Sequence, residues 1–252
     1  MNFAVISDIH LGTEPGVDEF GHTVESFTRF LHWLESTHSK IYLNGDVFEG
    51  LRGRRLGRRG RHSEVFRAYA KHSILRDRLT SAKYEWISGN HDPDTAELGI
   101  PQYRVLELDT TRILFVHGEQ FDRIEQCLPG LSPLVNWVNA WTNRWIGRDA
   151  DDGLYRLEAW LLGIREEPKR DAFQRKAVRA AKSAGADVII VGHTHSGGVF
   201  RHPEAIYANS GTCSLGRFEW LSVDIPSRTV SFHRGSTDNP AVHISTWGTS
   251  QC

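Results

Sequence analysis

The chain has 252 residues, of which 39% are hydrophobic, and it is therefore long enough for one large domain with a substantial core. Its 30 lysines and arginines against 31 acidic residues leave a net charge of -1, which excludes an overall field that draws it onto nucleic acid or an anionic membrane. Three widely spaced cysteines without a CxxC motif exclude a disulfide framework and a thiolate metal site. No apolar run reaches the ~20 residues that span a bilayer, and no signal-peptide pattern opens the chain, so we expect a cytoplasmic protein.

The first predicted strand begins at Phe3 and runs into Asp8 and His10, followed by a glycine. On an extended backbone these two side chains point the same way, since they lie two residues apart. A carboxylate and an imidazole are both ligands of divalent metals. Asp and His also end strands by bonding the next turn, so the pair alone does not identify a metal site.

An amphipathic helix is predicted over residues 23–36, because apolar residues recur there at helical spacing. The next strand, Ile41 to Asn44, again ends in a glycine and a carboxylate, Gly45 and Asp46. This is the second strand end that carries a metal-ligand type.

A loop is predicted over residues 51–62, which hold few apolar residues and three glycines. Its six arginines are Arg52, Arg54, Arg55, Arg58, Arg59 and Arg61. One interpretation is a solvated charged loop. The other is an anion-binding loop in which Arg52, Arg54 and Arg55 contact the substrate, because guanidinium groups match phosphate and the loop follows the strand that delivers Asp46.

A helix is predicted over residues 63–80, with Ile74 among its inner residues, and a strand over 84–88. The strand ends in Gly89, Asn90, His91 and Asp92, which place an amide oxygen and an imidazole side by side. A hairpin of residues 103–108 and 112–116 then delivers His117.

Residues 128–165 are expected to be helical, with Leu134, Trp137, Val138, Trp141 and Trp145 on one face and a second short helix around Trp160. A tryptophan stripe at helical spacing is typical of a core. The alternative is an inserted helical cap whose apolar side faces a substrate or a second subunit.

A further helix is predicted from Pro168 to Gly185, followed by a buried strand over 187–191 and then His193 and His195. Strand Ala205 to Ala208 and a hairpin of 218–225 and 228–233 come next, and the residues from 238 onward are expected to form a loose tail. These elements predict an α/β sandwich. We expect one domain, residues 1–240, with a helical insertion at 128–167 and a tail at 241–252.

Metal-ligand types thus follow five predicted strands, at the carboxyl ends where open α/β sheets place their sites. The candidate residues are Asp8, His10, Asp46, Asn90, His91, His117, His193 and His195. Eight nitrogen and oxygen ligands without a thiolate exceed the needs of one cation and suit two divalent transition-metal ions, with Mn as the first choice and Fe, Zn, Co or Ni as alternatives. Two such ions about 3.5–4 Å apart hold a hydroxide for in-line attack at phosphorus.

The ordered motifs D-x-H, G-D, G-N-H-D, an isolated histidine after a strand and G-H-T-H resemble those of the calcineurin-like metallophosphoesterases. The resemblance covers residues 1 to about 225. It implies a four-layer αββα sandwich, with Asp8, His10 and His195 on one metal, Asn90, His117 and His193 on the other, and Asp46 bridging them. It also implies that His91 contacts the phosphoryl oxygen or protonates the leaving group, with Asn90 near the substrate and Asp92 orienting His91.

Within this superfamily the chain is most similar to the bacterial UDP-2,3-diacylglucosamine diphosphatase group, through residues 42–48, 117–122 and 206–211 and the helical insertion. In that group the insertion forms a lid over acyl chains. Two positions depart from its pattern, since that group commonly has Arg in place of His91 and Asp in place of Glu119. His91 is the residue that the wider superfamily uses.

We therefore expect a dinuclear phosphoesterase that hydrolyses a phosphodiester, a pyrophosphate or a phosphomonoester, with a UDP-sugar lipid or a nucleotide among the candidate substrates. One alternative is a nuclease of the same superfamily that binds nucleic acid through the arginine-rich segment. Another is a metal-binding scaffold without catalysis. Peripheral membrane contact through the arginine-rich segment is compatible with the lipid substrate.

Overall fold

In a computed structural model of the chain we describe residues 1–14, 17–108, 110–122, 126, 131–146, 166–236 and 239–246. The first of two sheets has the strand order β11-β10-β9-β1-β2-β3. Its strands are β1 (Asn2–Ile6), β2 (Lys40–Asn44), β3 (Tyr84–Ile87), β9 (Glu219–Asp224), β10 (Thr229–Ser236) and β11 (Asn239–Thr246). Strands β1, β2 and β3 are parallel neighbours, so their carboxyl ends lie at one edge of the sheet.

The second sheet has the order β4-β5-β6-β8-β7. Its strands are β4 (Tyr103–Leu108), β5 (Thr111–Val116), β6 (Val188–Val191), β7 (Gly198–Arg201) and β8 (Ile206–Asn209). Here β5, β6 and β8 run parallel, with antiparallel β4 and β7 at the two edges.

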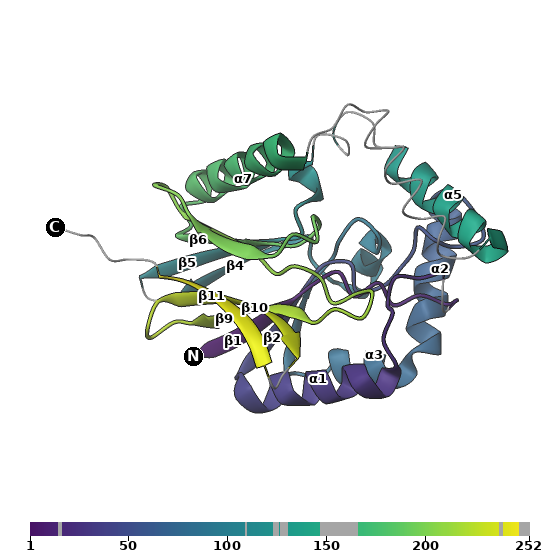
Figure 1. Ribbon diagram of the computed structural model, residues 1–252, viewed down its shortest axis with the longest axis horizontal. Helices are drawn as coiled ribbons and strands as arrows, with labels where there is room; N and C mark the ends of the chain where they lie inside the picture. The colour runs from purple at the N-terminus through teal and green to yellow at the C-terminus, as the bar shows by residue number, and fades with distance from the viewer. Residues whose placement is uncertain are drawn as a thin grey trace.

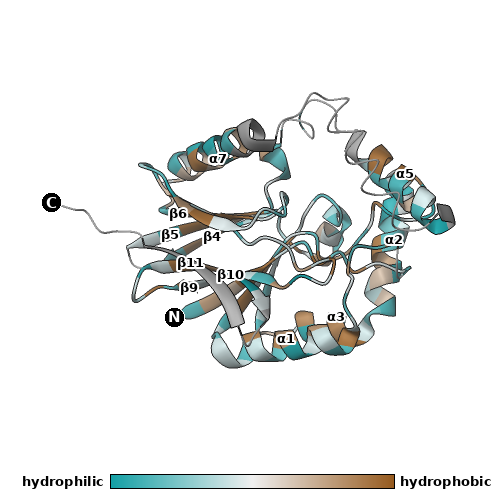
Figure 2. Ribbon diagram, viewed as in Figure 1, coloured by the Kyte–Doolittle hydropathy of each residue, from teal (hydrophilic) through white to brown (hydrophobic). Residues whose placement is uncertain are grey.

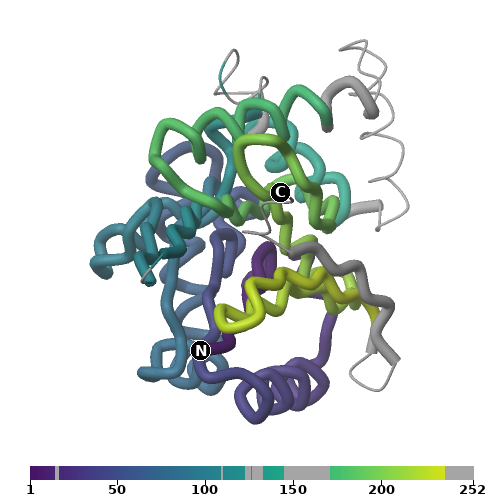
Figure 3. The backbone as a smooth tube through the Cα atoms, turned by 90° about the vertical axis from the view of Figure 1, so that its left-hand side faces the viewer, coloured from purple at the N-terminus to yellow at the C-terminus, as the bar shows by residue number. Residues whose placement is uncertain are grey.

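The two sheets stack face to face, and helices cover their outer faces (Figure 1). The helices are α1 (Val24–Thr37), α2 (Arg58–Lys71), α3 (Ser73–Leu79), α5 (Leu131–Ile146) and α7 (Glu166–Ser183), with 3-10 turns η1 (Pro93–Leu98) and η2 (Glu119–Phe121). Helix α7 lies over the second sheet, and α1 and α3 lie under the first; the view from the side shows the same layering (Figure 3). The four-layer αββα sandwich expected from the resemblance is therefore confirmed.

Three separate hydrophobic clusters fill the spaces between the four layers. Because side chains alternate along a strand, each central strand feeds two of them. On β1, Ala4 and Ile6 pack toward the helices, whereas Phe3 and Val5 pack between the sheets. On β6, Val188 and Ile190 join the cluster between the sheets, and Ile189 and Val191 pack against α7.

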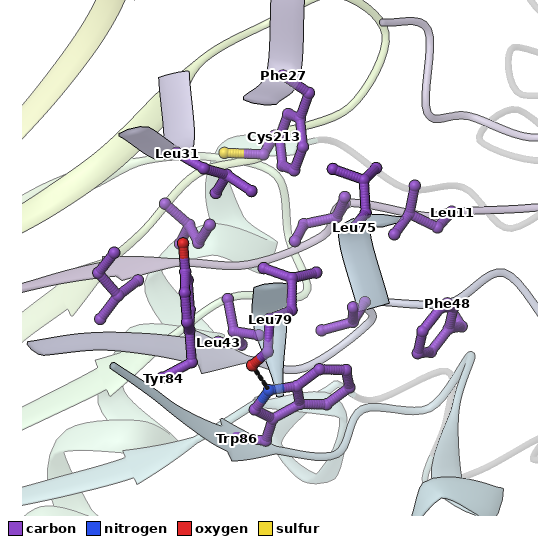
Figure 4. Packing of buried hydrophobic residues seen from close by; sticks show 14 of the residues in the cluster. Leu11, Phe27, Leu31, Leu43, Phe48, Leu75, Leu79, Tyr84, Trp86 and Cys213 are labelled. Carbon is purple, nitrogen blue, oxygen red and sulfur yellow. Dashed lines mark hydrogen bonds between the residues drawn. The ribbon is translucent and has the colours of Figure 1, made fainter. Parts of the chain in front are cut away.

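The cluster under the first sheet is the largest and joins β2 and β3 to α1 and α3 (Figure 4). Leu31, Leu75 and Leu79 of the helices belong to this cluster together with Leu43 of β2, and the Trp86 indole N–H donates to the Leu79 carbonyl at 2.7 Å. Figure 2 shows hydrophobic and hydrophilic residues alternating along α1 and α7, as expected of helices that cover a sheet.

The single helix expected over residues 63–80 is wrong at its start and is interrupted, whereas its end agrees with that of α3 at Leu79. Helix α2 begins at Arg58, inside the segment expected to be a loop, and it ends at Lys71. Helix α3 then starts at Ser73 after His72, whose φ of -93° and ψ of 44° interrupt the helix. As a result Ile74, expected on the inner side, is 73% exposed.

The loose tail expected from residue 238 is wrong for residues 239–246, which form β11 and pair antiparallel with β10. Strand β7 had no prediction. The hairpin β4–β5, the strands β6 and β8 and the hairpin β9–β10 lie where the sequence pattern indicates.

Helix α5 lies in the segment expected to be an inserted cap, and part of its predicted apolar stripe is exposed, whereas Trp137 is partly buried. Leu134, Val138 and Trp141 are all classed as exposed. On another face, Arg144 donates from Nε to Glu14 at 2.8 Å and from Nη2 to the Arg52 carbonyl at 2.7 Å. The second helix expected around Trp160 and the side chain of Trp145 lie outside the described residues. None of the described helices is long and apolar enough to cross a membrane.

Candidate metal centre

The side chains predicted as metal ligands lie in the loops that follow β1, β2, β3, β5 and β6. Five of these residues have a left-handed backbone conformation: Asp8 (φ 54°), His10 (54°), Asp46 (53°), His193 (65°) and His195 (50°). This conformation costs a non-glycine residue of order 1–2 kcal/mol. Backbone strain concentrated on the same residues is typical of functional sites, where the fold holds side chains in an imposed direction.

One group of side chains joins the first loop to the last. The Asp8 Oδ1 atom lies 3.1 Å from His195 Nε2 and 4.0 Å from His10 Nε2. His10 and His195 approach each other to 3.4 Å between their Nε2 atoms. Asp8 and His10 are fully buried, whereas the His195 side chain is 28% exposed, so the group opens to solvent on the His195 side.

A second group surrounds Asp46. His117 donates from Nδ1 to the Asn44 carbonyl at 2.9 Å, which directs its other ring nitrogen, Nε2, toward Asp46 Oδ2 at 3.1 Å. The same Asp46 oxygen lies 4.0 Å from His10 Nε2. One carboxylate oxygen therefore faces imidazoles from both groups.

His193 and Asn90 extend the second group toward solvent. His193 Nδ1 lies 3.1 Å from Asn90 Oδ1, and its Nε2 lies 3.3 Å from Asp122 Oδ2. An Nε2–H directed at Asp122 leaves the Nδ1 lone pair beside Asn90. Asp122, which follows η2, is a site residue that the sequence analysis missed as an orienting group.

Two buried polar atoms without a hydrogen-bond partner indicate that this arrangement fits divalent metal ions. Asp8 Oδ1 and His117 Nε2 are both buried and make no hydrogen bond within good geometry. Such atoms are costly unless another partner satisfies them. Ligands bound at 2.0–2.2 Å to one ion lie about 3 Å apart, as these atoms do from their neighbours. Asp8, His10 and His195, and likewise Asp8, Asp46 and His117, can each present ligand atoms to one ion.

Charge in the site is balanced between carboxylates and imidazoles. Burial raises the pKa of Asp8, but His195 and His117 outweigh it and hold that pKa at about 2. Burial lowers the pKa of His117, but the Asp46 carboxylate outweighs it and raises the pKa well above the usual range. This raised pKa keeps the His117 imidazole protonated without metal, so a metal ion that binds His117 Nε2 would displace a proton.

His91, the proposed catalytic imidazole, lies beside this centre. Its Nε2 is 4.0 Å from Asp46 Oδ2, and its ring packs edge-to-face on His10 with centroids 4.6 Å apart. Its Nδ1 lies 2.9 Å from Glu49 Oε1. The expectation that Asp92 orients His91 is wrong, because Glu49 occupies that position; Glu49 follows Asp46 by three residues, and no motif in the sequence marked it.

Asp92 instead ties the loop after β3 to the loop after β2. Its Oδ2 accepts the backbone N–H groups of Val47 and Phe48 at 2.8 and 3.1 Å, and its Oδ1 accepts that of Gly89 at 2.8 Å. Burial and the neighbouring Asp46 raise the pKa of Asp92 to about 6.

Glycines allow these loops to approach one another. A Cβ on Gly45 would lie 2.2 Å from His117 Nδ1, and a Cβ on Gly89 would lie 2.1 Å from Asp46 Oδ1. A Cβ on Gly192 would lie 2.7 Å from Asp8 Oδ2. At these three positions the backbone passes so close to a proposed ligand that only glycine fits without a shift of its neighbours.

The three arginines predicted to bind substrate differ in their exposure to solvent. Arg52 is buried and pairs with Glu19, so its guanidinium is committed to the protein. Arg54 donates from Nε to Glu14 at 2.6 Å and is otherwise exposed, and Arg55 is exposed. The segment 51–62 does not form one continuous anion-binding loop.

Comparisons with known proteins identify the family and agree with the fold. The family model described as calcineurin-like phosphoesterase matches residues 1–197. Among solved structures, the chain is similar to Vps29 from Entamoeba histolytica complexed with Zn²⁺ (13% identity over 97% of this chain and 98% of that one, TM-score 0.51) and Vps29 from Chaetomium thermophilum (14%, 98% and 96%, TM-score 0.52). A novel archaeal phosphodiesterase is matched at 13% identity over 93% of this chain and all of that one, with a TM-score of 0.48. At these identities the Vps29 structures show the fold alone. No curated protein matches the chain.

Proposed function

This chain belongs to the calcineurin-like phosphoesterase family, and from that membership we propose that it hydrolyses a phosphate ester or diphosphate bond with the help of two divalent metal ions. The family supports metal-dependent phosphoester hydrolysis in general. The dinuclear site, the metal and the substrate are parts of our proposal.

The observation that carries the proposal is the position of Asp46. Its Oδ2 faces His117 Nε2 at 3.1 Å and His10 Nε2 at 4.0 Å, so one carboxylate lies between two sets of ligands. Asp8, His10 and His195 would hold one ion, and Asn90, His117 and His193 the other. A site that combines carboxylate and amide oxygens with imidazoles and has no thiolate suits divalent transition-metal ions, and we propose Mn, with Fe, Zn, Co or Ni as alternatives.

When bound, two such ions supply an activated water as nucleophile and stabilise negative charge on the phosphoryl group. The residues of the chain position these reactants. His91 presents Nε2 toward the centre, with its side chain only 11% exposed, and is placed to contact a phosphoryl oxygen or to protonate the leaving group. Asn90 and His195 are partly exposed, and we propose that a substrate contacts them.

The substrate class that we propose is a small phosphodiester, pyrophosphate or phosphomonoester. A UDP-sugar lipid, as in the UDP-2,3-diacylglucosamine diphosphatase group, is the narrower proposal, and the exposed apolar residues of α5 support it. His91 and Glu119 favour the wider superfamily instead. A panel of nucleotides, dinucleoside polyphosphates and UDP-sugars in Mn²⁺ buffer separates these substrates.

The nuclease alternative loses its main support in the structure. It depends on the positive charge of the arginine-rich segment, yet Arg52, Arg54 and Arg61 each pair with a carboxylate. Their charge is therefore partly neutralised before any phosphate arrives.

A binding role without catalysis is the second candidate, because two of the similar structures carry the name of a sorting protein, one of them complexed with Zn²⁺. Metal binding alone therefore does not separate the two candidates. Turnover separates them.

The direct test replaces Asp46 with Asn. We expect D46N to lose Mn²⁺-dependent hydrolysis of bis(p-nitrophenyl) phosphate and p-nitrophenyl phosphate, because the carboxylate shared by the two ligand groups is gone. D94N is the matched control, since Asp94 is also buried but pairs with Arg61. Retained activity in D46N would exclude the proposed site, and a wild-type protein that binds metal but hydrolyses none of the panel would favour the binding role.

A further inference from the structure

The two oxygens of the Asp8 carboxylate have different surroundings, although the whole side chain is buried. Oδ2 accepts the hydroxyl proton of Ser7 and, at 3.2 Å, the backbone N–H of His193. Oδ1 makes no well-oriented hydrogen bond in the described part of the chain and lies 3.1 Å from His195 Nε2. A carboxylate oxygen has about two lone-pair sites, so two donors fill Oδ2 and leave Oδ1 open.

Ser7 is held in turn by the loop after β8, which carries no proposed metal ligand. Ser7 and Ser210 are both fully buried, and their Oγ atoms lie 2.7 Å apart. The Thr212 hydroxyl of the same loop donates to the Asp8 carbonyl at 3.0 Å, and the Cys213 N–H donates to the Ser7 carbonyl at 3.1 Å. The loop after β8 therefore fixes both the backbone and the hydroxyl that precede the Asp8 carboxylate.

Each hydroxyl has one proton, and the strength of the available acceptors decides where it points. Ser7 Oγ also lies 3.3 Å from the Gly211 carbonyl, and Ser210 Oγ lies 3.1 Å from the Val191 carbonyl. An ionised carboxylate is a stronger acceptor than a carbonyl, so Ser7 donates to Asp8. Ser7 Oγ then accepts the proton of Ser210, since their contact is the shorter of the two that Ser210 Oγ makes.

We propose that Ser7, supported by Ser210, is a positioning residue that occupies Asp8 Oδ2, so that Asp8 offers a metal ion Oδ1 alone. This inference rests on the metal centre of the proposed function. A carboxylate that binds through both oxygens uses two coordination positions of an ion, and one that binds through a single oxygen leaves the second position for water or substrate. No motif in the sequence marks Ser7 or Ser210, and the match to the family model ends at residue 197, before the loop after β8.

The first test is a pair of crystal structures with Mn²⁺ bound, which show directly how Asp8 binds the ion. In the wild-type protein we expect Oδ1 alone within bonding distance of the ion, with Oδ2 still bonded to Ser7. In S7A we expect the carboxylate to turn and bring Oδ2 to the ion as well, because this oxygen has lost a donor. A wild-type Asp8 that binds through Oδ2 or through both oxygens would overturn the inference, and so would an S7A in which Asp8 still binds through Oδ1 alone.

The second test measures affinity for Mn²⁺ alone by titration calorimetry. We expect the affinity of S7A to fall about 10–100-fold, because hydrogen-bond partners of a metal ligand typically contribute that much, and the affinity of S210A to fall by a smaller factor. S222A is the matched control, since Ser222 Oγ also has a side-chain partner, His38 Nε2 at 2.9 Å, but contacts no proposed ligand. Wild-type affinity in a folded S7A, or an equal loss in S222A, would contradict the positioning role.

The outcomes separate the inference from the function on which it rests. Binding of Mn²⁺ through Asp8 Oδ1 and weaker binding in S7A, in a protein that hydrolyses no phosphate ester, would support the positioning role and refute the hydrolase. Hydrolysis by a wild-type protein whose Asp8 binds through both oxygens would refute the positioning role and leave the hydrolase in place.

Discussion

At the scale of single residues, the site is held by strained backbone and by carboxylates that accept several N–H groups. Asp8 and Asp46 adopt left-handed conformations, which are uncommon for non-glycine residues. Asp46 Oδ1 also accepts the His91 N–H at 2.8 Å. The sheets behind these loops must supply the free energy that keeps them strained, which explains why the proposed ligands directly follow buried strands.

Asp92 gives the first prediction about a single residue. D92N should lower the free energy of unfolding of the metal-free protein by about 1–3 kcal/mol, because the amide nitrogen replaces an oxygen that accepts buried backbone N–H groups. Urea denaturation measures the change. The control D77N, at a position 68% exposed, should stay within about 0.5 kcal/mol of wild type. An equal loss of stability in both variants would show that the hydrogen bonds of Asp92 to the two loops do not stabilise the protein.

At the scale of elements, the candidate site is the meeting point of two parallel strand sets. Strands β1, β2 and β3 deliver Asp8, His10, Asp46, Asn90 and His91, and β5 and β6 deliver His117, His193 and His195. The loops remain paired beyond the strands, since the Ile9 and His10 N–H groups donate to the Asp46 carbonyl at 2.9 and 3.0 Å. These hydrogen bonds keep the loops after β1 and β2 side by side beyond the ends of their strands.

Gly45 tests how closely the elements must approach. G45A should weaken Mn²⁺ binding strongly, because the new Cβ would overlap the His117 ring, 2.2 Å from Nδ1. G57A is the matched control: Gly57 has a similar φ of 90° against 94°, but no atom lies within 4 Å of its ideal Cβ. Both variants bear the backbone strain, of order 1 kcal/mol. Equal metal affinity in the two would contradict the contact.

Much of this arrangement could be predicted from the sequence, since Asp-x-His or Gly-His after an apolar strand is a local pattern, and parallel neighbours bring such ends together. Glu49 could not be predicted this way, because its partners come from three different loops. The predicted role of Asp92 is wrong for a related reason. Its position next to His91 in the sequence suggests a contact, whereas the backbone conformation directs its carboxylate toward the Val47 N–H group. The run of arginines suggests a surface loop, but Arg52 is buried and pairs with Glu19, a residue distant in the sequence.

The missed strand β11 shows a second limit. It gains its structure from backbone pairing with β10, and Pro240 and several small polar residues leave its own sequence without a strand pattern. The break between α2 and α3 at His72 has no glycine or proline to mark it.

At the scale of the whole molecule, the three hydrophobic clusters hold the two sheets and their covering helices together. The proposed ligands come from loops of both sheets. Ions that bind only the folded chain stabilise the whole sandwich, since the site exists only when both sheets are in place. We infer that the stability of the metal-free protein also depends on His233, a half-buried histidine outside the site whose ring burial keeps neutral.

His233 provides the test of that dependence. Its ring stacks on Trp220 with centroids 4.9 Å apart, and burial lowers its pKa to about 4. In the unfolded chain the pKa is near 6.5, so between pH 6.5 and 4 the unfolded state binds a proton that the folded state refuses, and stability falls as the pH falls. H233F keeps the stack without a titrating group.

Thermal melts of the metal-free protein at pH 7.5 and pH 5 should show a smaller loss of melting temperature for H233F than for wild type. The comparison cancels the other titrating groups, because both proteins share them. An equal or larger loss in H233F would show that His233 does not contribute to the acid sensitivity.

The central claim is that two metal ions occupy the ends of the parallel strands, with Asp46 between them. The most direct measurement is anomalous diffraction from crystals soaked in Mn²⁺. The account predicts two peaks of manganese scattering, one among Asp8, His10, His195 and Asp46 and the other among Asp46, Asn90, His117 and His193. A single peak, or none at these side chains, would contradict it.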